Sequence, residues 1–96
     1  MPVIRVRIAV PAAGDLRSIR TYIARDSEAA AGAVVHRIRE SIAHLRRHPE
    51  LGRVGRITGT RELVVAGLPY LVIYRLNDST VEVLRVLHDT REWPLS

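Results

Sequence analysis

The fold is decided by residues 61–87, which read RELVVAGLPYLVIYRLNDSTVEVLRVL. Three largely apolar runs, at 61–66, 70–76 and 81–87, are separated by the turn-forming sequences AGLP at 66–69 and NDS at 77–79. Runs of this length bounded by Gly, Pro, Asn and Asp are typical of strands joined by tight turns. The stretch therefore predicts an antiparallel meander of three strands. Because its middle run is apolar on both faces, we expect that strand to be central, with Leu71 and Tyr74 in structural positions.

Upstream of the meander, the hydrophobic period changes to that of helices. One helix should follow residues 11–14 and end near Arg25, with an apolar stripe at Leu16, Ile19 and Ile23. A second helix should begin after Ser27, a good N-cap residue, and end near Arg47. Its stripe consists of Ala31, Val34, Val35, Ile38, Ile42 and Leu45. Because the turn between them is very short, the two helices should form an antiparallel hairpin.

The remaining segments complete the predicted topology. Residues 3–10 alternate arginine with apolar side chains and predict a further strand, which Pro11 would end. Residues 49–60 contain one proline and three glycines and are expected to form a loop. The order is β-α-α-β-β-β, which indicates an α+β fold with the helix hairpin packed on one face of a mainly antiparallel sheet. A length of 96 residues predicts a single domain over 1–96.

Composition limits the classes of function. All 15 basic residues are arginines, and against 10 acidic residues they give a net charge of +5, which favours a polyanion or an acidic protein as partner. The chain has no cysteine, so disulfides and thiolate metal sites are excluded. No apolar run approaches the 18 residues of a membrane span, and the N-terminus lacks the apolar core of a signal peptide. We therefore expect a cytoplasmic protein with no membrane partner.

Much of the positive charge lies between Arg37 and Glu62, where seven arginines face three glutamates and account for +4 of the total of +5. Two interpretations remain open: a solvated helix face with a polar loop, or a surface that binds an anionic target. The residues expected at such a surface are Arg46, Arg47, Arg53, Arg56 and Arg61, together with Arg91 and Trp93 near the C-terminus. Trp93 could instead cover the open end of the core.

The histidines and tyrosines have ordinary structural interpretations beside their chemical ones. His44 and His48 have a spacing that can hold zinc on a helix, but no further ligand is evident, so we expect no metal site. His88 ends the last predicted strand and could act as a general acid or base, or could order the loop that follows. Tyr70 and Tyr74 should share one face of their strand and flank the core.

Several segments together resemble the RelE/ParE superfamily of toxins from bacterial type II toxin–antitoxin pairs. The segments are DLRSIRTYI at 15–23, PELGR at 49–53, TRELVV at 60–65, PYLVIYR at 69–75, LRVLH at 84–88 and REWP at 91–94. The likeness covers nearly the whole chain, and the order of the segments matches the predicted topology. It implies a growth-inhibiting toxin that is neutralised by a small, acidic antitoxin, contacts operator DNA only within the complex with that antitoxin, and uses no cofactor.

The resemblance implies two alternative activities, ribosome-dependent mRNA cleavage in RelE-type members and poisoning of DNA gyrase in ParE-type members. The nuclease candidates are Arg61, His88 and Arg91. However, Glu62, Val64 and Leu71 stand where the cleaving members carry basic residues, and a carboxylate there would repel a phosphate. The sequence therefore favours the gyrase-directed branch. A third alternative is a non-catalytic module that binds an acidic partner.

Overall fold

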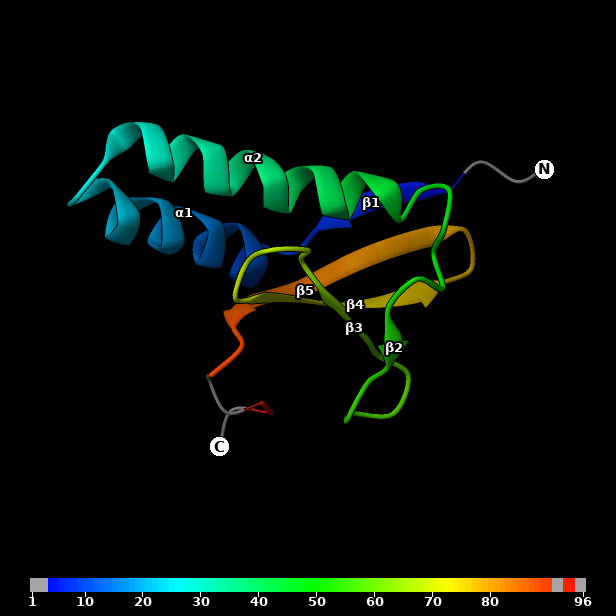
Figure 1. Ribbon diagram of the computed structural model, residues 1–96. Helices are drawn as coiled ribbons and strands as arrows, with labels where there is room; N and C mark the ends of the chain where they lie inside the picture. The colour runs from blue at the N-terminus through cyan, green and yellow to red at the C-terminus, as the bar shows by residue number, and fades with distance from the viewer. Residues whose placement is uncertain (1–3, 91–92, 95–96) are drawn as a thin grey trace.

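The computed structural model describes residues 4–90 and 93–94, and it forms two helices packed on a mixed five-stranded sheet (Figure 1). The elements are β1 (Arg5–Ile8), α1 (Val10–Ala24), α2 (Glu28–His44), β2 (Arg53–Val54), β3 (Arg61–Val64), β4 (Tyr70–Asn77) and β5 (Thr80–His88). The strand order is β1-β5-β4-β3-β2, in which β1 runs parallel to β5 and every other neighbouring pair is antiparallel. The predicted α+β class and the meander of β3, β4 and β5 are confirmed.

Three predicted boundaries are wrong, each for a local reason. Strand β1 ends at Ile8, and α1 already begins at Val10 with Pro11 in its first turn, where the missing N–H of proline removes no helical hydrogen bond. The predicted loop at 49–60 contains the short strand β2, which pairs with β3 at Arg53 and Glu62. Strand β3 ends at Val64, because Val65 closes the following turn through its N–H to the Tyr70 carbonyl at 3.0 Å.

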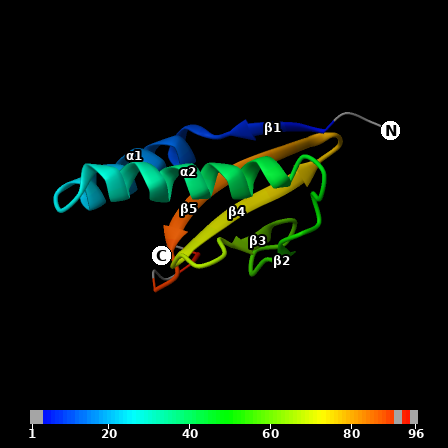
Figure 2. The same cartoon turned by 45° about the horizontal axis from the view of Figure 1, so that its top comes forward.

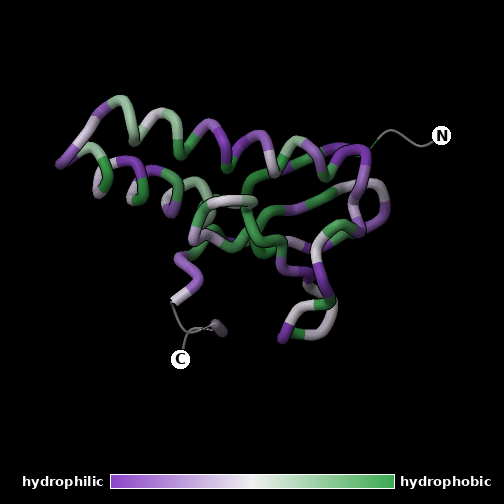
Figure 3. Tube along the Cα trace, in the orientation of Figure 1, coloured by the Kyte–Doolittle hydropathy of each residue, from purple (hydrophilic) through white to green (hydrophobic). Residues whose placement is uncertain are grey.

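The helix hairpin covers one face of the sheet, as predicted (Figure 2). The Ser27 hydroxyl caps α2 by accepting from the Ala30 N–H at 3.0 Å. The buried core between helices and sheet contains Ala12, Leu16, Ile38, Ile42, Leu45, Val65, Tyr70, Val72, Tyr74, Val81, Val83 and Val86. Figure 3 shows the apolar colour concentrated in the central strands, whereas the helices alternate between polar and apolar residues. No helix in the described part of the chain is long and apolar enough to cross a membrane.

Residues of β4 are buried on both faces of the sheet from Tyr70 to Tyr74, which confirms β4 as the central strand. Leu71 and Ile73 alternate with the core residues and therefore point away from the helices, as Glu62 does, because Glu62 pairs with Ile73. In Figure 1 the segment after β2 and the short red piece at residues 93–94 lie on this second side of the sheet, opposite the helices. The second face is thus covered near β3.

Candidate functional site

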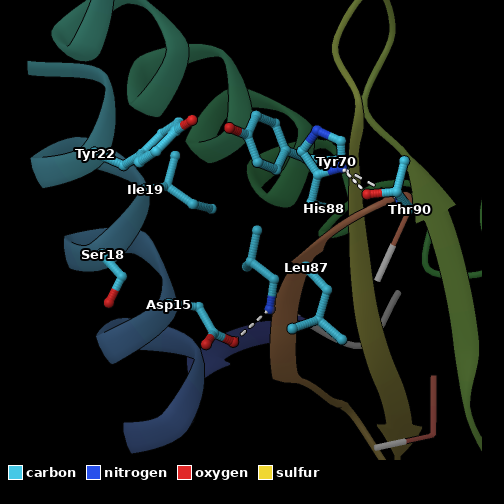
Figure 4. A pocket seen from close by; sticks show the side chains of 9 residues that line it. Asp15, Ser18, Ile19, Tyr22, Tyr70, Leu87, His88 and Thr90 are labelled. Carbon is cyan, nitrogen blue, oxygen red and sulfur yellow. Dashed lines mark hydrogen bonds between the residues drawn. The ribbon is translucent and has the colours of Figure 1, made fainter. Parts of the chain in front are cut away.

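A groove of about 400 Å³ lies between α1 and the end of β5 (Figure 4). It is lined by Asp15, Ser18, Ile19 and Tyr22 of α1, by Tyr70 of β4, by Val86, Leu87 and His88 of β5, and by Thr90. Figure 4 shows the Tyr22 and Tyr70 rings reaching toward each other from opposite walls. Burial, followed by the electrostatic influence of Tyr22, raises the pKa of the Tyr70 phenol, so this hydroxyl remains protonated and can donate a hydrogen bond.

The groove exists because β1 ends before β5 does. Beyond the Ile8–Val83 pair, the outer edge of β5 has no neighbouring strand, and the Asp15 carboxylate accepts from the Val86 N–H at 2.9 Å in place of one. Arg85 holds the same carboxylate through two hydrogen bonds of 2.8 and 2.9 Å. The bidentate pair raises the pKa of the Arg85 guanidinium and fixes α1 against the sheet edge.

His88 stands at the rim of this groove and makes local contacts. Its Nδ1 accepts from the Thr90 backbone N–H at 3.2 Å, lies 2.8 Å from the Thr90 hydroxyl, and is 3.3 Å from the Asp89 carboxylate. Its ring packs edge-to-face on Tyr70, with centroids 5.5 Å apart. These contacts correspond to the loop-ordering role that the sequence left open for His88.

Arg61 lies far from His88. Arg61 pairs with Tyr74 and His88 pairs with Tyr70, so strand spacings place the two backbones roughly 16 Å apart. The Arg61 guanidinium is also engaged, because it donates to the carbonyl of Gly52 at 2.8 Å and to that of Glu50 at 3.3 Å. The same segment is held by Tyr74, whose hydroxyl accepts from the Gly52 N–H and donates to the Pro49 carbonyl, both at 2.8 Å. The Arg61 guanidinium therefore holds the backbone at residues 50–52.

The arginine-rich segment divides into engaged and free side chains. Arg53 and Arg56 bind Glu62, although each keeps half or more of its side chain exposed, 59% and 50%. Arg46 and Arg47 follow α2, are exposed, and make no side-chain hydrogen bond or ion pair with the described residues. Two residues near the C-terminus were also predicted for this surface. Trp93 is partly buried, and its backbone carbonyl accepts a hydrogen bond from the Arg56 guanidinium. Arg91 lies outside the described residues.

Glu62 does not lie beside Arg61 and His88, as the sequence suggested; it is buried on the opposite face of the sheet. Burial alone would raise the pKa of its carboxyl. The Arg56 backbone N–H, the Arg53 hydrogen bond and both guanidinium charges outweigh that effect and hold the pKa below its ordinary value of 4.5. The Glu62 carboxylate is therefore paired with two arginines and does not face the surface as a free charge.

We expect the contribution of Glu62 to the free energy of unfolding to depend on pH. Because the pKa of its carboxyl is lower in the folded than in the unfolded chain, this stability is fully present above about pH 4.5 and is lost as pH falls below it. The difference in unfolding free energy between the wild type and Glu62→Gln should shrink from pH 6 to about pH 3 in urea titrations. A difference that stays constant or grows over this range would contradict the lowered pKa.

No group of three or more potential metal ligands occurs among the described residues. His44 ends α2 and His48 follows in the next turn, both exposed, while His36 lies on the surface of α2 with its Nε2 3.4 Å from Glu40. Sequence reasoning missed the pair of Asp15 and Arg85 because 70 residues separate them. The one available signal was an acid on the sheet-facing side of α1, one residue before the buried Leu16.

Comparisons with known proteins identify the family to which the chain is similar. The family model described as ParE toxin of the type II toxin–antitoxin system parDE matches residues 6–93. The protein Y4kP of Sinorhizobium fredii, a toxin by name, is 42% identical over 94% of this chain and 93% of its own length. Toxin RelE2 of Caulobacter vibrioides is 38% identical over 83% of this chain and 89% of its own.

Two solved structures share the fold. One is from the chromosomal ParDE system of P. aeruginosa, with a TM-score of 0.81 and 22% identity over 90% of this chain and 96% of the other. The second is from the RelBE2 toxin–antitoxin complex of Mycobacterium tuberculosis, with a TM-score of 0.61 and 27% identity over 91% of this chain and 99% of the other. Because the family model spans nearly the whole described chain, the protein belongs to the ParE toxin family of type II toxin–antitoxin systems.

Proposed function

We propose that this toxin inhibits growth by binding DNA gyrase and stabilising its cleaved complex with DNA, without cleaving RNA itself. The observation that carries the proposal is the sheet face formed by Glu62, Val64 and Leu71. At these positions, where the resemblance to cleaving members implies cations, the chain has a neutralised carboxylate and two apolar side chains. A phosphate there would meet only the Arg53 and Arg56 guanidinium groups, which already pair with the Glu62 carboxylate.

Of the remaining nuclease candidates, the two that the structure describes, Arg61 and His88, lie too far apart to share one phosphate. Cleavage needs a base, an acid and positive groups within about 3 Å of one phosphate. Arg61 lies opposite Tyr74 in the middle of β4 and is bound to two backbone carbonyls, whereas His88 lies opposite Tyr70 at the start of β4. The loss of one transition-state donor costs roughly 10²–10³ in rate, so a site without two of them would be close to inactive.

A binding surface for gyrase needs charge and shape but no such cluster. We propose that it comprises Arg46 and Arg47, the segment 53–60, and the tail at Trp93. The segment 53–60 exposes Val54 (78%) and Ile57 (38%) beside the guanidinium groups of Arg53 and Arg56. Apolar side chains next to arginines are typical of protein-binding surfaces.

We also propose a small acidic antitoxin as the partner that neutralises the toxin. The α1–β5 groove offers apolar walls at Ile19 and Leu87. The exposed Arg17 lies on α1 nearby, and the exposed Arg25 directly follows this helix. An apolar anchor on an acidic, initially disordered segment would fit both features and would fold as it binds. Contact with operator DNA would then come through the antitoxin complex.

The test is a paired assay of the purified protein. With gyrase, ATP and plasmid, it should accumulate linear DNA, and the cognate antitoxin should prevent this accumulation. With programmed ribosomes, it should leave the mRNA intact. His88→Ala should retain gyrase poisoning, because His88 lies outside the proposed gyrase surface. Codon-specific mRNA cuts that disappear in His88→Ala would overturn the proposal in favour of the ribosomal activity.

A further inference from the structure

Among the described residues, Glu62 is the one acidic residue whose side chain is fully buried. Its carboxylate contacts several groups of one segment of the chain. Its Oε1 accepts from the Arg53 guanidinium at 3.1 Å, and its Oε2 accepts from the Arg56 backbone N–H at 3.0 Å. The Arg56 Nε lies 3.7 Å from Oε1. One carboxylate therefore fixes two arginine side chains and the backbone between them.

The segment between these contacts closes on itself. The Gly55 N–H donates to the Thr60 carbonyl at 2.8 Å, and the Thr60 hydroxyl and N–H donate to the Ile57 carbonyl at 2.6 and 3.1 Å. A Cβ at Gly55 would clash with the Thr60 hydroxyl and lie 2.9 Å from the Thr60 carbonyl oxygen, so only glycine fits there. Segment 53–60 is thus a compact turn with Glu62 as its anchor in the sheet.

Arg56 carries the connection to the C-terminal segment. Its Nη1 donates to the Trp93 carbonyl at 2.9 Å, across 37 residues of sequence. The Trp93 ring is partly buried, and its indole nitrogen is inaccessible to solvent. Contacts therefore run from the Glu62 carboxylate through Arg56 to the tail.

We propose that Glu62 is a positioning residue that holds segment 53–60 and the tail at Trp93 together as one preformed surface. This inference rests on the proposed gyrase-binding function, for which that surface is the target-binding one. A buried carboxylate is expensive to desolvate, and well-packed apolar residues often serve stability as well or better. Here the Glu62 carboxylate binds the exposed Arg53 and Arg56, and Arg56 in turn donates to the Trp93 carbonyl. A positioning role requires such contacts to the surface. A rigid surface loses less conformational entropy on binding than a loose one.

The first test uses Glu62→Gln, with Glu82→Gln as the matched control. Glu82 is also mostly buried, at 15% side-chain exposure, and also binds two arginines on this sheet, Arg75 and Arg7. Among the described residues, its side chain makes ion pairs with these two arginines and none with segment 53–60. Trp93 is the only tryptophan of the chain, so its fluorescence reports directly on the tail.

In Glu62→Gln, we expect Trp93 emission to shift to longer wavelength and amide-exchange protection at Arg56 to fall by about tenfold or more. Protection of Val72 and Val83 in the sheet should change less than threefold, and Glu82→Gln should change neither readout. Unchanged Trp93 emission and unchanged Arg56 protection would overturn the proposal. An equal loss of protection throughout the sheet would also overturn it, because that result indicates general destabilisation.

Arg56→Met keeps the proposal testable if Glu62→Gln does not fold. This variant retains the Glu62–Arg53 pair and the backbone hydrogen bond at residue 56, but it removes the link to Trp93. Trp93 emission should therefore shift while the protection of the residue-56 amide persists. Emission identical to that of the wild type would show that Arg56 does not hold the tail.

Gyrase poisoning then separates the two hypotheses. If the wild type does not act on gyrase, the proposed function fails before any variant is compared. If the wild type acts and the variant with the released tail is at least about tenfold weaker, corresponding to about 1.4 kcal/mol of binding, the positioning role is supported. If the tail is released and the potency is unchanged, the role of Glu62 in target binding is overturned.

Discussion

Replacement of Leu71 by alanine should lower the free energy of unfolding by about 2–5 kcal/mol. Leu71 is 4% exposed and lies on the second face of β4, away from the helices. The substitution removes three buried carbon atoms and leaves a cavity under the covering segments, which can relax only partly. Because a domain of this size has about 5–15 kcal/mol of total stability, the variant should be visibly destabilised in urea titrations.

Val64→Ala is the matched control for this prediction. Val64 pairs directly with Leu71 across β3 and β4, so both side chains share one face, but Val64 is 56% exposed. Its truncation should cost less than about 1 kcal/mol, since most of the side chain already contacts water. Equal losses for the two variants would mean that the second face is not closed over Leu71.

The order of elements was predictable because each depends on neighbours in the sequence. The stripe that includes Ile38 and Ile42 has the helical period, and both residues are buried. The apolar run from Tyr70 predicted a central strand, and β4 lies between β5 and β3. These hydrophobic patterns repeat within a few residues, so they can be recognised in a short stretch of sequence.

The arrangement of the site depended on contacts that no local pattern describes. Strand β2 has two residues and exists only because β3 offers its edge to Arg53 and Val54. Arg61 and Glu62 are adjacent in sequence but point to opposite faces, so their roles differ: one holds the carbonyls of residues 50 and 52, the other anchors Arg56. The sequence gives the charges of Arg61 and Glu62, but it does not predict which groups each of them binds.

Asp15→Ala should be the second strongly destabilising change, at about 3 kcal/mol, near the lower end of the range for a broken buried ion pair. The side chains of Asp15 and Arg85 are 14% and 24% exposed, so removal of the carboxylate leaves a guanidinium with little solvent to replace its partner. The Val86 N–H loses its acceptor at the same time. Both losses occur where β1 has ended and no strand can compensate.

Glu82→Ala is the control, because it removes a carboxylate of similar exposure from β5, the strand that carries Arg85. Glu82 is 15% exposed, but its partners Arg75 and Arg7 are 51% and 72% exposed and can return to water. Its loss should therefore cost no more than about 1 kcal/mol. The double variant Asp15→Ala with Arg85→Met should recover part of the stability lost in Asp15→Ala, since it removes the stranded charge. If Asp15→Ala proved no worse than Glu82→Ala, the carboxylate would not be what joins α1 to the open edge of β5.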